Sequence, residues 1–240
     1  MSRRIVIAHL YPGDMNIYGD QGNVLALIRR LEWRGYAAEV RAVSIGQPFD
    51  FATADIVFGG GGQDSGQSII GADLLTRGPE LRAAAAAGMP MLLICGLYQL
   101  FGRGFTTLDG RELSGIDVFK ASTIGSTTRM IGNIIVESPR FGRLVGFENH
   151  SGQTILEPTQ APLGRVTSGY GNDARSHKEG AISGNAIGTY LHGPVLPKNP
   201  RLADDLLLHA LQARYGVTEL EPLDDGVEKA AANIAYGRPR

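Results

Sequence analysis

Short, continuous apolar runs alternate with segments of helical periodicity in the first part of this chain. The runs predict strands at residues 4–10, 38–43, 55–58 and 91–94. A strand without polar alternation is buried on both faces, which is typical of a parallel sheet covered from both sides by its connecting helices. The pattern therefore predicts an α/β fold with a mostly parallel central sheet flanked by helices.

Helical patterns separate and follow these strands. Residues 23–34 (NVLALIRRLEWR) place apolar side chains at helical spacing, and Gly35 follows as a C-cap. Residues 79–87 (PELRAAAAA) predict a helix that begins at its proline and ends before a glycine. Residues 199–215 predict a third helix with leucines along one side.

The second half of the chain has a different pattern. Residues 116–136 combine β-branched residues with polar alternation, interrupted at Gly125 and Gly132. This pattern predicts paired, antiparallel strands. Residues 186–191 (AIGTYL) predict one more strand. We therefore expect an antiparallel extension beside the parallel sheet.

Composition and charge narrow the class of protein. No linker rich in Pro, Gly or Ser divides the 240 residues, so we expect one domain over residues 1–222 and a tail over residues 223–240. The net charge of −1 does not suggest a nucleic-acid partner. A single cysteine excludes an internal disulfide and a multi-cysteine metal site. The N-terminal segment reads as a strand and not a signal peptide, and no apolar stretch is long enough to span a bilayer, so we expect a cytoplasmic protein.

Cys95 lies where the last apolar strand of the first half meets a helical pattern, in MLLICGLYQLFG. Such a turn places the side chain at the carboxyl edge of the sheet, where open α/β folds bind ligands. A helix N-terminus favours the thiolate, and Gly96 permits the tight turn of a nucleophile elbow. Taken alone, Cys95 is equally well explained as a small buried residue that ends a strand.

Four glycines follow the third predicted strand, in FGGGGQD at residues 58–64. Their backbone N–H groups could stabilise an oxyanion or cradle a phosphate, and a flexible turn is the simplest alternative. The run lacks the lysine of a P-loop, which excludes that kind of nucleotide site. Because the run precedes Cys95 by one βα unit, we expect both loops at the same edge of the sheet.

His192 follows the predicted strand at residues 186–191 and precedes a glycine. A histidine there can form a thiolate–imidazolium pair with Cys95. His150, in FENHSG, is a rival because it also lies in a glycine-flanked segment, and a structural role is the commoner fate of any single histidine. Arg129 could bind a substrate carboxylate through two hydrogen bonds, or it could be a solvated residue of a strand.

The ordered set of motifs resembles class I glutamine amidotransferases, in particular the cobyric acid synthase branch and, within it, the GatD family of glutaminase subunits. The resemblance covers nearly the whole chain. It implies a single glutamine amidotransferase domain that hydrolyses L-glutamine to glutamate and ammonia. The motifs that carry it are YGDQGN (18–23), GGGGQD (59–64), ICGLYQ (94–99), GFENH (146–150), GYGN (169–172) and TYLHGPVLPKN (189–199).

The resemblance also implies a role for each candidate residue. Cys95 matches the nucleophile, His192 the general base and acid, and Arg129 the arginine that binds glutamine. Oxyanion donors would come from Gly60 and Gly61 and from the backbone N–H that follows the nucleophile. No metal or cofactor is expected in this chain.

A partner subunit is implied as well. It would be a MurT-like synthetase of the Mur ligase family, forming a heterodimer and using ATP and Mg²⁺ to activate the D-glutamate α-carboxyl of the lipid II stem peptide for peptidoglycan biosynthesis. The lipid-linked substrate would bring the complex to the inner face of the plasma membrane. The alternatives are amidation of a corrinoid-like acceptor, a different cysteine hydrolase on a similar fold, and a non-catalytic binding subunit.

The chain departs from the family pattern at two places. Class I enzymes usually have G-x-C-x-G around the nucleophile, whereas this chain has Leu93 and Leu97, so the elbow must accommodate larger side chains. An acid usually follows the catalytic histidine by two residues, and here that position is Pro194. The orienting acid must come from elsewhere in this chain or from the partner. The resemblance favours an aspartate of the partner, which would make glutaminase activity depend on the complex.

Overall fold

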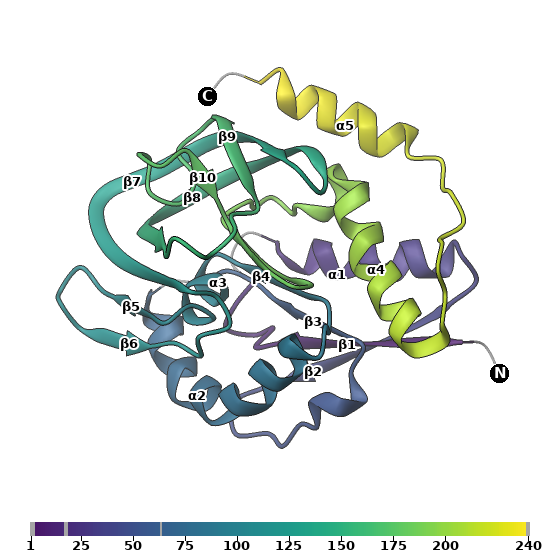
Figure 1. Ribbon diagram of the computed structural model, residues 1–240, viewed down its shortest axis with the longest axis horizontal. Helices are drawn as coiled ribbons and strands as arrows, with labels where there is room; N and C mark the ends of the chain where they lie inside the picture. Colours follow the sequence, from purple (N-terminus) through teal and green to yellow (C-terminus); the bar gives the residue numbers. More distant parts are fainter. Residues whose placement is uncertain (1–2, 17–18, 63, 239–240) are drawn as a thin grey trace.

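The computed structural model describes residues 3–16, 19–62 and 64–238 of the chain. Tyr18 of YGDQGN and Gln63 of GGGGQD therefore lie outside the described residues. Within the described part, a six-stranded sheet has the order β11-β12-β4-β3-β1-β2 (Figure 1). Its strands are β1 (Arg4–Leu10), β2 (Ala37–Val43), β3 (Ile56–Gly59), β4 (Met91–Ile94), β11 (Ala181–Ser183) and β12 (Ala186–Thr189).

The mostly parallel character predicted for this sheet is confirmed. β1 pairs in parallel with β2 and β3, and β4 pairs in parallel with β3 and β12, whereas β11 runs antiparallel to β12. β1 and β4 have the bounds predicted from their apolar runs, β2 begins one residue earlier than predicted, and β3 is shifted by one residue toward the C-terminus. Every residue of β3, β4 and β12 is buried, which explains why these strands show no polar alternation.

Helices cover both faces of the sheet. On one face α4 packs on β1, β3 and α1, and on the other α3 packs on β4 and β12 and contacts α2 (Figure 1). The helical elements of the described residues are α1 (Gln21–Glu32), η1 (Phe51–Thr53), α2 (Asp64–Ala86), α3 (Gly96–Leu100), η2 (Leu196–Lys198), α4 (Pro200–Tyr215) and α5 (Gly226–Tyr236).

The helix predicted to begin at Pro79 was predicted too short, because α2 begins at Asp64 and Pro79 lies inside it. Its buried stripe, at helical spacing, contains polar residues that hide the apolar periodicity. Arg77 in this stripe is nearly buried and donates through Nε to Asp73 Oδ2 at 2.6 Å. The buried stripe consists of Gln67, Ile70, Leu74, Arg77 and Leu81.

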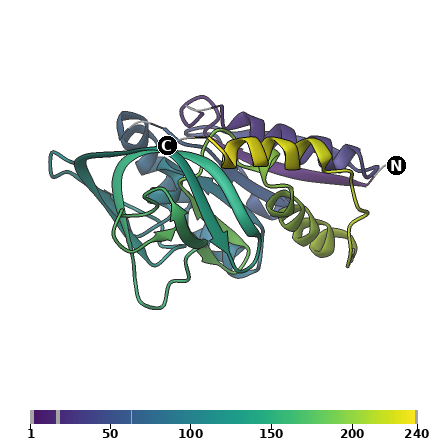
Figure 2. The same cartoon turned by 90° about the horizontal axis from the view of Figure 1, so that it is seen from above.

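A second sheet lies beside the first (Figures 1 and 2). It is built around the long antiparallel pair of β7 and β8, so the predicted antiparallel extension is confirmed. The register shifts between Gly125 and Met130, whereas Gly132, also predicted as an interruption, pairs in register with Glu148. The strands are β5 (Gly104–Thr106), β6 (Glu112–Ser114), β7 (Ala121–Ser138), β8 (Gly142–Leu156), β9 (Gly164–Ser168) and β10 (Lys178–Glu179).

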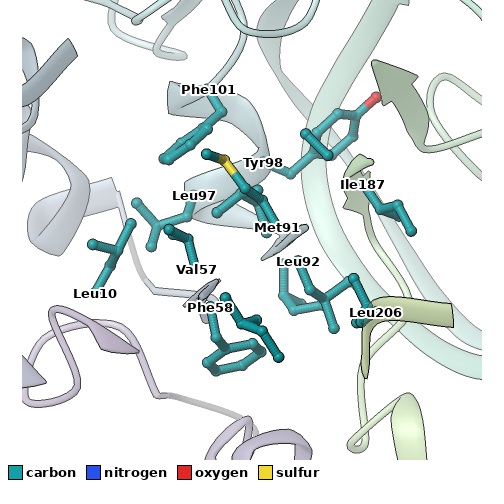
Figure 3. Close-up of a cluster of buried hydrophobic side chains, with 14 of the residues drawn as sticks. Leu10, Val57, Phe58, Met91, Leu92, Leu97, Tyr98, Phe101, Ile187 and Leu206 are labelled. Carbon is teal, nitrogen blue, oxygen red and sulfur yellow. The ribbon is translucent and has the colours of Figure 1, made fainter. Parts of the chain in front are cut away.

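The main hydrophobic core surrounds the central sheet (Figure 3). Val57, Phe58 and Leu92 from the sheet are fully buried. Leu206 of α4 and Tyr98 of α3 pack from opposite faces and are also fully buried. The core thereby fixes the strand ends from which the polar loops emerge.

The C-terminal tail ends in the exposed helix α5, which runs on the same side of the molecule as α1 (Figure 2). Arg30 of α1 holds it by an ion pair with Asp225 at 2.7 Å, and Glu228 approaches the same guanidinium at 3.9 Å. Further along, the Arg143 guanidinium lies 4.4 Å from the ring centroid of Tyr236. No helix in the described ranges has both the length and the apolar character needed to cross a membrane.

Candidate active site

Several polar loops meet at the carboxyl edge of the central sheet. Gly60 and Gly61 directly follow β3, Cys95 directly follows β4, and His192 lies just beyond β12. Asp20, in the loop after β1, joins them at the start of α1. Because these strands are parallel neighbours, their carboxyl ends form one edge, and open sheets of this kind bind ligands there.

Cys95 has a strained backbone at the junction of β4 and α3. Its φ of 49° and ψ of −102° lie outside the regions that side chains ordinarily allow. A hydrogen bond from its N–H to the Thr189 carbonyl at 2.8 Å helps to hold this conformation, and the side chain is 7% exposed. Strain of this kind persists where the surrounding structure enforces it, as at a nucleophile elbow.

The glycine run packs tightly against Cys95 and His192. A methyl group at Gly61 would lie 2.8 Å from His192 Cε1 and 3.2 Å from Cys95 Cβ, so both side chains flank this residue. A methyl group at Gly60 would lie 2.2 Å from the Met15 carbonyl oxygen. The chain therefore needs glycine at both positions because other groups approach the backbone closely.

The backbone N–H of Gly61, expected to be an oxyanion donor, has a side-chain acceptor in this structure. This N–H donates to Asp20 Oδ2 at 2.7 Å and is therefore already engaged. Gly96 contacts the same run from the other side, since a methyl group there would lie 3.2 Å from the Gly62 nitrogen. The elbow and the glycine run thus form one packed unit.

His192 is held by backbone and side-chain neighbours. Its N–H donates to the Phe147 carbonyl at 2.7 Å, and its carbonyl accepts from the Phe147 N–H at 3.2 Å. The imidazole is 1% exposed, with Nδ1 3.7 Å from Asp20 Oδ1. Burial opposes protonation, but the Cys95 thiolate and the Asp20 carboxylate raise the His192 pKa well above its usual range. The surroundings therefore favour a charged imidazolium beside Cys95.

The rival histidine, His150, has a different environment. It stacks on Tyr190 with ring centroids 3.5 Å apart, and its Nδ1 contacts the Gly152 carbonyl at 2.8 Å. Burial lowers its pKa to about 3, and the charges of His192 and Arg129 act in the same direction. His150 is therefore neutral near pH 7.

Arg129 lies on β7 at the register shift and is exposed. Its Nε donates to Asn149 Oδ1 at 2.6 Å, and the next residue, Met130, pairs with His150. Arg129 therefore belongs to the strand pair that carries His150 toward the carboxyl edge.

A buried polar chain near Cys95 was not predicted from the sequence. Gln67 Nε2 donates to Gln99 Oε1 at 2.8 Å, and Gln99 Nε2 donates to the Tyr190 hydroxyl at 3.0 Å. The Tyr190 hydroxyl also bonds to Thr154, and burial raises the Tyr190 pKa. These residues come from four segments distant in sequence, so no local spacing could have indicated the chain of contacts.

Glu179 is a buried acid that sequence reasoning also missed. Its Oε1 accepts from the Thr189 hydroxyl at 2.6 Å and from the Tyr190 N–H at 2.7 Å. These contacts fix the segment that leads into His192. Burial raises the Glu179 pKa from 4.5 to about 7, because the charged form loses hydration.

Replacing Glu179 by glutamine is expected to raise stability increasingly between pH 5 and pH 8. The fold favours the protonated acid, so wild-type stability falls as pH rises through 4.5 to about 7, by roughly 3 kcal/mol in total. Glutamine keeps an acceptor and carries no charge. The difference in melting temperature between variant and wild type should therefore widen with pH, and parallel pH curves would contradict the assignment.

Comparisons with known proteins agree with this architecture. Residues 6–200 match the model of the CobB/CobQ-like glutamine amidotransferase domain. The chain is 38% identical over 234 residues, 98% of this chain and 96% of the relative, to "Lipid II isoglutaminyl synthase (glutamine-hydrolyzing) subunit GatD" of Staphylococcus aureus (strain N315). It is 40% identical over 212 residues, 88% of this chain and 82% of the relative, to the protein of the same name from Streptococcus pneumoniae (strain ATCC BAA-255 / R6).

More distant likenesses involve longer proteins or the fold alone. A "Probable cobyric acid synthase" of Methanothermobacter thermautotrophicus is 32% identical over 57% of this chain but only 29% of its own length. Among solved structures, "Crystal structure of glutamine amidotransferase" has a TM-score of 0.60 at 14% identity, covering 85% of this chain and 98% of that one. "Structure of PurLQS from Thermotoga maritima" has a TM-score of 0.56, also at 14% identity, covering 86% and 98%.

Proposed function

The chain belongs to the CobB/CobQ-like glutamine amidotransferase family and is a glutamine amidotransferase, and we propose that it is the glutamine-hydrolysing subunit of a lipid II isoglutaminyl synthase. The observation that carries this proposal is the identity of 38% over 98% of the chain to a subunit with that name. The placement of Cys95 and His192 around Gly61 supports the chemistry.

We propose a thioester mechanism. The Cys95 thiolate attacks the side-chain carboxamide carbon of L-glutamine and forms a tetrahedral oxyanion. The His192 imidazolium protonates the leaving nitrogen, so that ammonia departs and a glutamyl thioester remains. A water molecule then attacks the thioester while His192, now neutral, takes a proton from that water. The C–S bond breaks, glutamate leaves, and the Cys95 thiolate again faces a protonated His192.

Backbone N–H groups would hold the oxyanion in this mechanism. Gly96, directly after the nucleophile, supplies one donor at the elbow. Gly60 remains a candidate for the second, whereas the Gly61 N–H is used by Asp20. Loss of one such donor typically costs about 10²- to 10³-fold in kcat.

Arg129 would bind the α-carboxylate of glutamine through its guanidinium. We expect Arg129→Ala to raise the KM for glutamine at least about tenfold, since charge-assisted hydrogen bonds contribute about 1.5–3 kcal/mol. Alkylation of Cys95 by iodoacetamide, which has no α-carboxylate, should proceed at the wild-type rate. An unchanged KM would remove Arg129 from the binding site.

A synthetase partner follows from the proposal. Glutamine hydrolysis releases ammonia but activates no acceptor, and the sequence carries no P-loop for ATP. We propose a heterodimer with a MurT-like subunit of the Mur ligase family, which uses ATP and Mg²⁺ and binds lipid II at the inner face of the membrane. Both relatives of similar length are named as subunits, which supports a partner.

A corrinoid-like acceptor is the second candidate. It is favoured by the matches to cobyric acid synthases, but the chain covers only 29–32% of the length of two of them. The lipid II assignment accounts for the full length of this chain far better.

The proposal is tested by purifying the chain with its MurT-like partner and supplying glutamine, ATP, Mg²⁺ and lipid II. We expect glutamate to form and the lipid II mass to change as a carboxyl becomes a carboxamide. Omission of glutamine is the control. Glutamine hydrolysis with transfer only to a corrinoid acid would favour the second candidate, and absence of hydrolysis would overturn both.

A further inference from the structure

The Cys95–His192 pair needs an acid behind the imidazole. A carboxylate that accepts from Nδ1–H fixes the tautomer and orientation of the ring and stabilises its protonated form. Two residues after His192 the chain has Pro194, which provides no acid. The requirement must be met by another residue.

Asp20 has the position that this role needs. Its side chain is 0% exposed, and its Oδ1 lies 3.7 Å from His192 Nδ1. Catalytic hydrogen bonds are often longer than usual before substrate binds and shorten in the substrate complex. The remaining separation is therefore compatible with a direct contact during the reaction.

The carboxylate of Asp20 is also turned away from its ordinary local partners. Asp20 is the N-cap residue of α1, where an aspartate usually accepts from backbone N–H groups of its own helix. Its side chain makes no such bond. Instead Oδ2 accepts from the Gly61 N–H at 2.7 Å, which leaves Oδ1 on the side of His192.

The Asp20 carboxylate is buried, and a buried charge needs compensation. An ionised carboxylate without access to water is costly unless a cation or several hydrogen bonds compensate it. Oδ1 has no hydrogen-bond partner within the described residues, and the imidazole of His192 is its ion-pair neighbour. A protonated His192 would compensate this carboxylate.

We propose that Asp20 is the positioning residue that orients the His192 imidazole, so that this chain completes its own cysteine–histidine–aspartate arrangement from the loop before α1. The proposal rests on the glutaminase function proposed above. Through Gly61, Asp20 also ties the glycine run to the same array.

The test is Asp20→Asn, measured in the full chain with and without its MurT-like partner. Asparagine keeps an oxygen that accepts from the Gly61 N–H, so the glycine run should stay in place. It replaces the acceptor facing Nδ1 by a group that favours the wrong tautomer. We expect kcat for glutamine hydrolysis to fall by about 10²- to 10⁴-fold, with little change in KM. Asp14→Asn, the same change at an exposed aspartate of the same loop, is the matched control and should behave as wild type.

A spectroscopic readout separates orientation of the ring from a structural role. In the chain labelled with ¹⁵N-histidine, the Nδ1–H resonance of His192, assigned by its absence in His192→Gln, should move or disappear in Asp20→Asn and persist in Asp14→Asn. An unchanged resonance, an unchanged kcat, or a loss of kcat that the partner restores would each overturn the proposal. Inactivity of the wild-type complex would instead count against the glutaminase function itself.

Discussion

Cys95→Ala is expected to abolish glutamine-dependent amidation by the complex and to leave amidation driven by added ammonium unchanged. The thiolate forms the covalent bond to the substrate, and no neighbouring residue can replace it. We expect the glutaminase rate to fall by at least about 10³-fold, as for other catalytic nucleophiles. Glutamate release and acceptor amidation, measured in parallel with glutamine or ammonium chloride, report the two activities separately.

The substitution should disturb the fold little. Alanine has the same backbone preference as cysteine at the observed φ of 49°, and loss of one buried sulfur costs about 1 kcal/mol. Thermal unfolding and co-purification with the partner are the controls. Retained glutaminase activity would exclude Cys95 as the nucleophile, and loss of both amidation activities would contradict the division of labour between the subunits.

Gly61→Ala is expected to reduce kcat for glutamine hydrolysis by about 10²-fold or more. The added methyl group would lie 2.8 Å from His192 Cε1, closer than such atoms can stay, and in tight contact with Cys95 Cβ at 3.2 Å. His192 cannot retreat easily, because two backbone hydrogen bonds join it to Phe147. A displacement of about 1 Å between reacting groups costs on the order of 10²-fold in rate.

Gly71→Ala is the matched control for Gly61→Ala. It lies in α2, and a methyl group there would meet no atom within 4 Å outside its own helix. We expect wild-type kinetics and a gain in stability of up to about 1 kcal/mol, since alanine is the better helix former. Ammonium-dependent amidation should survive in both variants. Normal glutaminase activity in Gly61→Ala would show that the site accommodates a methyl group between Cys95 and His192, contrary to this expectation.

The fold could be predicted where the pattern is local. The predicted bounds of β1 and β4 agree with the structure because each strand is a continuous, mostly apolar run that is buried in the sheet. α2 was predicted too short, because Gln67 and Arg77 occupy buried positions that apolar periodicity would assign to leucine or isoleucine. Arg77 is tolerated there because Asp73, one helical turn earlier, compensates its charge and the Ser44 and Gln47 carbonyls accept from its guanidinium.

The candidate site was predictable only in part. Cys95, His192 and the glycine run follow strands, so their meeting at one edge follows from a parallel sheet. The geometry of Gly61 did not follow, because its N–H points to Asp20, a residue 41 positions earlier in the chain. The family resemblance favours an aspartate of the partner as the acid that orients the His192 imidazole. In the structure, Asp20 of this chain lies beside that imidazole.

By itself, the sequence determined the apolar strands, the order of the loops and the residue types at the carboxyl edge. These features depend on residues that are neighbours along the chain, because the spacing of apolar residues follows from which positions of a strand or helix are buried. Only the tertiary structure decided which groups meet there: Asp20 with His192 and Gly61, and Glu179 with the segment before His192. Such contacts join residues far apart in sequence, and they depend on strand order and loop path, which no local pattern encodes.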